Sequence, residues 1–409
     1  MSRVLTQSTP LRRALGPVLL VLYGTGVTIG AGIYVLIGPV AGYAGQHAPW
    51  AFLLAAVVMG LTVASYAELC TRYPVAAGEA AYVRNAFRLR WLSTLTGLLM
   101  IGTAIVASAT VAIGASGYIA QFVDWPRPVV VTCIVVALGL VSMWGVLQSV
   151  LLASLFTLIE VAGLLIIIVV GVVRGVPVQD ALIIAPPADM AAWSGIAFAS
   201  LLAFFAFIGF EDLTNMAEET VAPERSMPVA MAITLIATTL LYMLVAAVAV
   251  TSVTPHELAT SAAPLSLVFR KIVGINPAVI SLIAIVATLN TILAEMTMAT
   301  RVVYGMARQG DLPRSFGHVH GLTATPVLAA VFVMAATILL TLVVPFLELA
   351  EATSIATLIV FALVNLALIR VRIRDGHGPH IRVPLWMPIA GFITSVGMIA
   401  SALLLNWLS

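Results

Sequence analysis

Residues 24–34 of this chain read GTGVTIGAGIY and lie inside an apolar stretch, residues 17–40, that is long enough to cross a bilayer. Four glycines among nine residues disfavour a continuous helix. Within a bilayer, an unwound segment must be buried in protein or line a wet cavity, because its amides find no water in the lipid. We therefore predict a membrane-spanning helix that is broken at these glycines.

A broken span leaves free N–H groups at the start of its second half. These groups and the helix dipole attract an anion, such as a carboxylate. The alternative is that the glycines only let neighbouring helices approach closely, as small residues do in membrane proteins. One glycine-rich stretch does not decide between the two interpretations, so a second break elsewhere in the chain would be informative.

The composition indicates a polytopic α-helical membrane protein. Of the 409 residues, 62% are hydrophobic and only 9% are charged, whereas about a quarter are charged in soluble domains. The two cysteines, Cys70 and Cys133, fall in different apolar stretches and are too few for a disulfide framework. We expect neither a metal site nor a cofactor, and no nucleic-acid partner.

Hydropathy predicts eleven membrane spans in a single transmembrane domain that covers residues 1–409. Their approximate limits are 17–40, 48–70, 91–121, 127–146, 150–173, 193–216, 227–252, 276–307, 325–346, 349–370 and 385–407. With the N-terminus in the cytoplasm, fifteen basic residues lie on the inner side, and four lie outside: Arg127, Arg174, Arg270 and Lys271. The excess of inner positive charge predicts this orientation in the plasma (cell inner) membrane, with an external C-terminus.

A second glycine break is predicted in the sixth span, where residues 204–212 read FFAFIGFED and Gly209 interrupts the helix. Spans one and six are each the first of a group of five. Paired broken spans indicate an inverted-repeat secondary transporter with its site at the membrane midplane. The predicted repeats are residues 17–173 and 193–370, and residues 385–407 form an additional span.

The two breaks together predict the kind of ligand. Amides of the first break would take an anionic group, and carbonyls freed in the second would take a cationic group. A small molecule that carries both groups close together is an α-amino acid.

The residues also resemble a known family, the amino acid–polyamine–organocation transporters. The matching motifs are residues 26–34 (GVTIGAGIY), 206–211 (AFIGFE), 217–219 (AEE) with Pro223 and Pro228, Glu68-Leu69 with Tyr73-Pro74 and Gly78, and 301–308 (RVVYGMAR) with Gly310 and Leu312-Pro313. They extend over roughly residues 12–370 in the family's order. The resemblance implies a five-plus-five inverted repeat, as in the leucine-transporter-type fold, that works by alternating access.

The resemblance also implies the site residues. The substrate carboxylate would bind at Gly30, Ala31 and Gly32. The amino group would meet carbonyls near Thr28, Ile29, Phe204 and Ile208, next to Ala206 and Gly209, and Phe205 would be an aromatic gate over the substrate. Ala31 stands where some relatives have a hydroxyl, so contacts to the carboxylate would come mainly from the backbone. Many relatives also have twelve spans rather than eleven.

Carboxyl groups at membrane depth are candidates for ion coupling, because such groups are costly unless they are paired, protonated or hydrated. The candidates are Glu160 in span five, Glu295 in span eight and Glu211 beside the second break, with Asn290 as a neighbouring polar residue. Proton coupling is favoured over sodium, because no dense cluster of hydroxyls marks a cation site. Substrate exchange and a purely structural, protonated Glu160 remain the alternatives.

The predicted function is therefore secondary transport of an amino acid, with the lipid bilayer and a proton or sodium as further partners. Spans three and ten lack acids that would hold a distal ammonium, which favours a neutral substrate over a cationic amino acid, an amine or a polyamine. An enzyme is disfavoured, because all six histidines fall in predicted loops or at span ends. A channel is disfavoured because no pore-lining ring of like residues is apparent. The oligomeric state is not predicted.

Overall fold

Helices dominate the computed structural model, which describes residues 15–73, 78–143, 150–183, 190–217, 220–320, 325–375 and 381–408. Among these residues the one β contact is an isolated bridge between Leu15 and Thr220. Pro74, Glu218 and Glu219, which belong to the predicted motifs, lie outside the described residues.

The first half of the chain contains both halves of the interrupted first span and the next four long helices. Pro17 begins the first helix at a position where its missing N–H costs no hydrogen bond. The elements are α1 (Pro17–Ile29), α2 (Gly32–Ala44), η1 (Gly45–His47), α3 (Ala48–Arg72), α4 (Gly78–Phe87), α5 (Arg90–Ile119), α6 (Arg127–Met143), α7 (Val150–Val173) and α8 (Val178–Ile183).

The second half begins with another interrupted span and ends with a helix outside the predicted repeats. Short helices connect the long ones, and one of them is fixed by a capping box between Thr254 and Glu257. The elements are α9 (Met190–Phe205), α10 (Asp212–Asn215), α11 (Pro223–Ser252), α12 (Pro255–Thr260), α13 (Pro264–Val273), α14 (Ala278–Gln309), η3 (Arg314–Gly317), α15 (Val327–Val343), α16 (Phe346–Asp375) and α17 (Trp386–Leu408).

Many of these helices are long and apolar enough to cross a membrane. Within the described residues, seven helical stretches qualify by length and hydropathy: Gly32–Arg72, Arg90–Ile119, Ser154–Val173, Pro223–Ser252, Ala278–Gln309, Phe346–Asp375 and Trp386–Leu404. Four shorter apolar helices accompany them: Pro17–Ile29, Arg127–Met143, Trp193–Phe205 and Val327–Val343. The chain is therefore a polytopic α-helical membrane protein.

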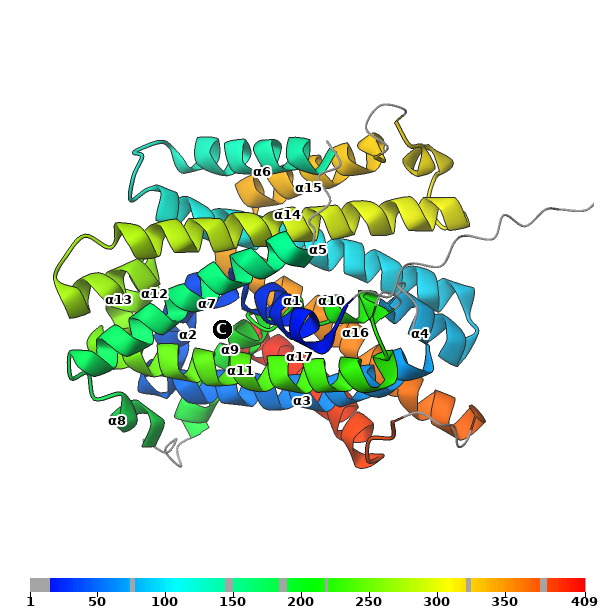
Figure 1. Ribbon diagram of the computed structural model, residues 1–409, viewed down its shortest axis with the longest axis horizontal. Coiled ribbons are helices and arrows are strands. Elements are labelled where there is room, and N and C mark those ends of the chain that lie inside the picture. Colours follow the sequence, from blue (N-terminus) through cyan, green and yellow to red (C-terminus); the bar gives the residue numbers. More distant parts are fainter. Residues whose placement is uncertain are drawn as a thin grey trace, which may run out of the picture.

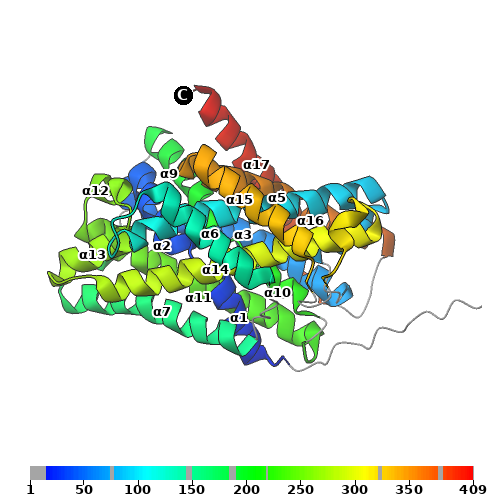
Figure 2. The same ribbon diagram turned by 90° about the horizontal axis from the view of Figure 1, so that it is seen from above.

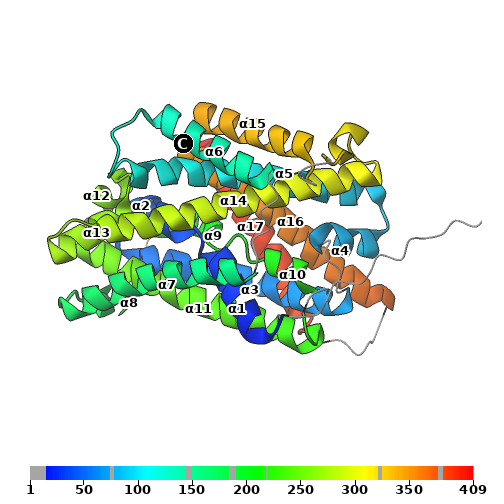
Figure 3. The same cartoon turned by 45° about the horizontal axis from the view of Figure 1, so that its top comes forward.

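The long helices lie side by side, and the short connecting elements gather at the two ends of the bundle (Figure 1). At one end α4 and η3 lie on the side where α1 begins, and α8, α12 and α13 lie at the other end. Helices α6 and α15 pack together on one outer face (Figure 3), whereas α17 projects from the bundle at its C-terminal end (Figure 2). Helix α1 packs between α7 and α11, so the first break is enclosed by protein.

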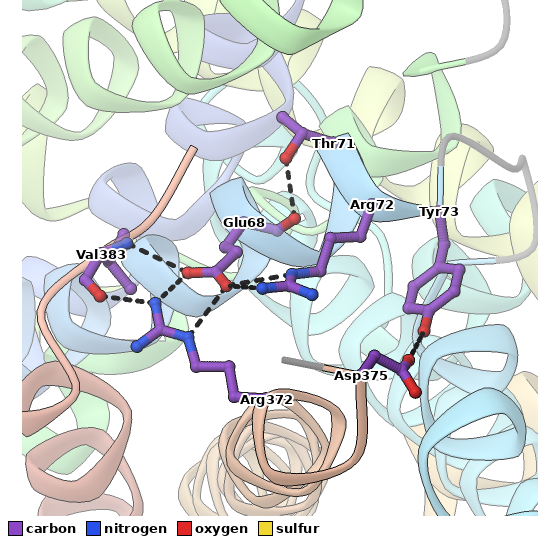
Figure 4. Close-up of polar contacts among 7 residues, drawn as sticks. All are labelled: Glu68, Thr71, Arg72, Tyr73, Arg372, Asp375 and Val383. Atoms are coloured by element: carbon purple, nitrogen blue, oxygen red, sulfur yellow. Dashed lines mark hydrogen bonds and ion pairs between the residues drawn. The ribbon is translucent and has the colours of Figure 1, made fainter. Parts of the chain in front are cut away.

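A buried carboxylate, Glu68, joins three segments at the α4 end of the bundle (Figure 4). The sequence spacing predicts that Glu68 pairs with Arg72 along one helix face, and the structure confirms the pair at 2.8 Å. The carboxylate also accepts hydrogen bonds from Arg372 of α16 and from the backbone N–H of Val383, which precedes α17. The Glu68 cluster, meaning these four residues, thus ties α3 to α16 and to the start of α17.

The arginines around α4 make protein contacts that the sequence did not indicate. Arg84 and Arg90 are candidates for binding lipid phosphates, yet Asp311 accepts from Arg90 at 2.9 Å and lies 3.8 Å from Arg84. The turn after α14 brings this carboxylate to the corner between α4 and α5. Both arginine side chains nevertheless remain substantially exposed, so they are not withdrawn from the surface.

Candidate functional site

The first glycine stretch is interrupted at Gly30 and Ala31. Helix α1 ends at Ile29, α2 begins at Gly32, and the N–H of Gly30 closes α1 by donating to the carbonyl of Gly26 at 2.9 Å. Gly24 and Gly26 stay helical. Of the four glycines, the interruption therefore contains only Gly30, and Gly32 begins the next helix.

The second interruption lies between α9, which ends at Phe205, and α10, which begins at Asp212. Tight turns replace the helix, and the N–H of Ile208 donates to the carbonyl of Phe205 at 3.1 Å. Gly209 has a φ of +102°, a conformation that side chains with a Cβ rarely adopt, so glycine is needed at this point. Its N–H donates to the Glu211 carboxylate at 3.0 Å, which fixes that side chain against the break.

The two breaks touch each other. A Cβ built on Gly32 would lie only 2.4 Å from the Cα of Ala206, so the two backbones meet with no space for a side chain between them. Tyr242 of α11 links them further, since its hydroxyl lies 2.9 Å from the Thr28 carbonyl and 2.7 Å from the Ala206 carbonyl, with Ile29 at 3.2 Å. Breaks that are far apart in the sequence thus form one structural unit.

A cavity lies at this junction and is called the break cavity here. Seven of the residues that the sequence singled out for substrate binding line it: Thr28, Gly30, Ala31, Gly32, Phe205, Ala206 and Ile208. Its other walls come from Val27, Ala107, Val111, Thr291 and Glu295. The cavity is therefore mostly apolar or backbone, with two hydroxyls and one carboxyl.

Three of the predicted site residues do not line the break cavity. Ile29 is completely buried, and Gly209 faces the backbone of Val27. Phe204 packs edge-on against Phe361 with ring centres 5.7 Å apart. Of the adjacent aromatic residues in this span, Phe205 is the one whose side chain is available to contact a ligand in the cavity.

Thr291 of α14 already binds one of the amides of the predicted anion site. Its hydroxyl accepts from the Ala31 N–H at 3.0 Å and donates to the Ala287 carbonyl at 3.0 Å. The hydroxyl oxygen thus occupies the position where a carboxylate oxygen is predicted to meet that amide. A ligand carboxylate must either displace this hydroxyl or share the site with it.

Two of the coupling candidates, Glu160 and Asn290, are hydrogen-bonded to each other. Glu160 of α7 is completely buried, and its Oε1 accepts from the amide of Asn290 in α14 at 3.3 Å. Its Oε2 has no hydrogen-bond partner among the described residues. The hydroxyl of Tyr34 donates to the backbone carbonyl of Glu160 at 2.7 Å, which holds α7 against α2.

Two further cavities adjoin the break cavity, and Glu295 lines all three. The α1–α14 cavity has Val27, Thr157, Asp212, Asn290, Thr291 and Glu295 among its walls. The α4 cavity has Tyr66, Glu79, Thr103, Glu211, Glu295 and Thr357 among its walls. The structure therefore brings Glu211 and Glu295 to one cavity, and Asn290 and Glu295 to another.

Sequence reasoning missed Tyr242, Asp212 and Glu79 as members of this region. A lone tyrosine in an apolar span is a usable signal, because a buried hydroxyl needs an acceptor. Asp212 directly follows Glu211, but Glu79 lies in a short polar helix, where nothing in the sequence marks it as buried.

Comparison with known proteins gives a family for the chain. A family model described as amino acid permease matches residues 15–407. The branched-chain amino acid permease BcaP of Bacillus subtilis is 30% identical over 394 residues, which cover 90% of this chain and 83% of that protein.

Two eukaryotic relatives are longer proteins, of which the chain spans only about three fifths. The vacuolar cationic amino acid transporter 2 of Arabidopsis thaliana is 29% identical, over 88% of this chain and 60% of its own length. The human cationic amino acid transporter 4 is 28% identical, over 91% of this chain and 62% of its own length. The chain therefore belongs to the amino acid permeases of the amino acid–polyamine–organocation superfamily, and it is a multi-pass integral membrane protein that transports amino acids and not an enzyme.

Proposed function

We propose that the chain is a secondary active transporter that moves a neutral amino acid across the membrane by alternating access. The observation that carries this proposal is the break cavity, where two interrupted helices meet with Gly30, Ala31 and Gly32 on one side and Phe205 on the other. Interrupted helices around a buried cavity are the usual substrate sites of such transporters.

In this proposal the substrate carboxylate binds the amides of the first break together with the Thr291 hydroxyl. The substrate ammonium binds carbonyls of Thr28, Ile29, Phe204 or Ile208, with Tyr242 exchanging its hydrogen bonds to that region. Phe205 covers the ligand and excludes water. The substrate side chain lies against Ala107, Val111 and Ile208, whose apolar surface suits a neutral group.

The wider architecture is part of the proposal. Residues 17–173 and 193–370 form two inverted repeats of five spans each, and residues 385–407 add an eleventh span. One interrupted helix opens each repeat, which supports this division. The basic residues support a cytoplasmic N-terminus, and the membrane is the cell's inner (plasma) membrane.

Proton coupling through Glu160 is the favoured energy source, with sodium coupling or substrate exchange as the alternatives. The carboxyl is buried beside the first break and pairs with Asn290. A change in its protonation would alter that pairing and bias the packing of α7 against α14. A coupling group needs this property, because its occupancy must shift the balance between inward-open and outward-open states.

A cationic amino acid or an amine is the second candidate substrate. The observation that favours it is Glu295, whose carboxyl lines the break cavity and could hold a distal positive charge. A neutral substrate requires that Glu295 be protonated or hydrated when the site is loaded. The two candidate substrates therefore require different charge states of the Glu295 carboxyl.

The test is uptake into proteoliposomes with a panel of labelled neutral amino acids, cationic amino acids and amines, under imposed proton or sodium gradients. We expect accumulation of neutral amino acids driven by the proton gradient. Accumulation only of lysine, arginine or amines would support the second candidate, and a requirement for sodium would overturn proton coupling.

The variant Glu160→Gln tests the coupling residue in the same vesicles. We expect it to keep substrate exchange but to lose proton-driven accumulation, because the amide keeps the shape of the side chain and cannot exchange a proton. Glu348→Gln, at an exposed carboxyl in the first turn of α16, is the matched control and should behave as wild type. Undiminished proton-driven accumulation by Glu160→Gln would exclude Glu160 as the coupling group.

A further inference from the structure

Glu79 is a buried acid in a helix that is not among the membrane-length helices. Its side chain is 1% exposed and lines the α4 cavity. Its Oε1 accepts from the hydroxyl of Tyr66 at 3.0 Å, whereas its Oε2 has no hydrogen-bond partner among the described residues. A buried carboxylate oxygen without a partner is costly unless it is protonated or meets water in the cavity.

The acids of this region form a continuous series from α7 to α4. Glu160 pairs with Asn290, and Asn290 shares the α1–α14 cavity with Asp212 and Glu295. Glu295 in turn shares the α4 cavity with Glu211 and Glu79. The charge of Glu79 acts on Glu211 and Asp212, and the charges of those two acids act on Glu295, so neighbouring acids lie within electrostatic reach of one another.

The composition of the cavity walls suits a cation rather than an anion. Among the described residues, no Arg, Lys or His side chain lines either cavity, so the acids have no basic partner there. Both cavities have room for a water molecule, and the hydroxyls of Thr103 and Thr357 in the α4 cavity have no other described partner. Series of carboxyl groups inside membrane proteins commonly serve as proton relays.

We propose that Glu79 is the last proton acceptor of a carboxyl series that carries the coupled proton from the substrate region to the α4 end of the molecule. The proton leaves the Glu295 carboxyl for the Glu211 carboxylate, passes to the Glu79 carboxylate through cavity water, and leaves to bulk water beyond α4. Each donor becomes a carboxylate and each acceptor becomes neutral in turn, so one proton crosses, and Glu295 then takes up a new proton from the Glu160 side, which returns the series to its starting charge. This inference rests on the proton coupling proposed above.

The surroundings of Glu79 favour the protonated form of its carboxyl more than water does. Burial raises the pKa of Glu79 above its ordinary value, and the hydrogen bond from Tyr66 offsets this only in part. The titratable groups that face it are Tyr66 of α3, Tyr82 of its own helix, and Glu211 and Asp212 at the second break. The walls that α5 and α16 contribute to the α4 cavity contain no titratable side chain.

The experiment uses wild-type protein and Glu79→Gln in proteoliposomes that contain a pH-sensitive dye. Substrate uptake and proton entry are measured together, and substrate exchange is measured without a gradient. We expect Glu79→Gln to retain exchange at the wild-type rate while accumulation falls to the level reached without a pH gradient. Glu79→Asp should recover part of the proton-driven accumulation, because it restores a titratable group.

Tyr66→Phe is the matched control, since it removes the hydrogen bond to Glu79 and leaves the carboxyl in place. It should keep proton-driven accumulation. A purely structural role for Glu79 predicts the opposite pattern, in which Tyr66→Phe and Glu79→Gln both reduce exchange and accumulation alike.

The failure of this inference is distinct from the failure of proton coupling. If wild-type vesicles accumulate substrate without any proton entry, then both the proposed coupling and this pathway are wrong. If wild type moves protons with substrate and Glu79→Gln moves them in the same ratio, the pathway through Glu79 is wrong, whereas the coupling stands.

Discussion

At the scale of single residues, the contact between Gly32 and Ala206 holds the two breaks together. The space between them does not admit even a methyl group, because a Cβ on Gly32 would meet backbone atoms, which cannot swing aside. The same contact forms one wall of the break cavity. A small change at this position should therefore act on ligand binding more than on membrane insertion.

We predict that Gly32→Ala weakens substrate binding by about 5- to 150-fold, which corresponds to about 1–3 kcal/mol of overpacking strain. Affinity is measured on the purified protein by competition with a labelled substrate. Ala31→Ser should bind nearly as wild type, because it adds only a hydroxyl. Gly102→Ala in α5, where a Cβ meets no atom within 4 Å, is the control for a glycine substitution as such. Wild-type affinity in Gly32→Ala would show that the two breaks need not touch for binding.

At the scale of helices, the Glu68 cluster fastens three segments with one carboxylate (Figure 4). The side chains of Arg72 and Arg372 are only 6% and 10% exposed, so each depends on Glu68 for its counter-charge. Removing one member of a buried ion pair leaves the other charge uncompensated, which costs more than losing an exposed pair. Neutralising this carboxylate should therefore weaken the packing among α3, α16 and the start of α17 at the end of the bundle where α4 lies.

We predict that Glu68→Gln destabilises the folded protein by about 3 kcal/mol and lowers its melting temperature in detergent. Glu257→Gln is the control, since Glu257 pairs with Lys271 at 2.9 Å in an exposed position and should change the melting temperature little. Melting is measured on purified protein at low and high salt. Equal melting temperatures for the two variants would mean that the cluster does not hold the helices together.

At the scale of the whole molecule, the bundle has two unlike ends. The end with α4 and η3 holds the arginines that follow α3 and α14, whereas α8, α12 and α13 cover the other end (Figure 1). In the proposed orientation the first end faces the cytoplasm. Helix α17 then leads the chain toward the outer side.

We predict that a reporter active only in the cytoplasm is inactive when it is fused after Ser409 and active when it is inserted after His318. The first fusion follows α17, and the second lies between η3 and α15. Activity is measured in intact cells, with expression of each fusion checked on a blot. A C-terminal fusion that is fully active would mean an even number of spans, and an inactive insertion would reverse the orientation.

Much of the architecture follows from the sequence because its determinants are local. An apolar stretch of sufficient length spans a membrane whatever surrounds it, and Gly30 interrupts its helix through its own backbone freedom, with a φ of +33°. The pair of Glu68 and Arg72 is also local, because residues four apart share one helix face. The family motifs add the positions of the two breaks.

The tertiary structure decided the contacts between distant segments. Tyr242 reaches Thr28 across 214 positions, and Arg372 reaches Glu68 across 304. No spacing rule predicts such pairs, because membrane helices are apolar on most sides and their sequences do not mark the face that turns inward. For the same reason Phe204 and Phe205 look alike in the sequence, and packing alone puts Phe205 on the cavity and Phe204 against Phe361. The sequence determined which segments cross the membrane and where two of them break, whereas only packing decided which polar groups share a cavity.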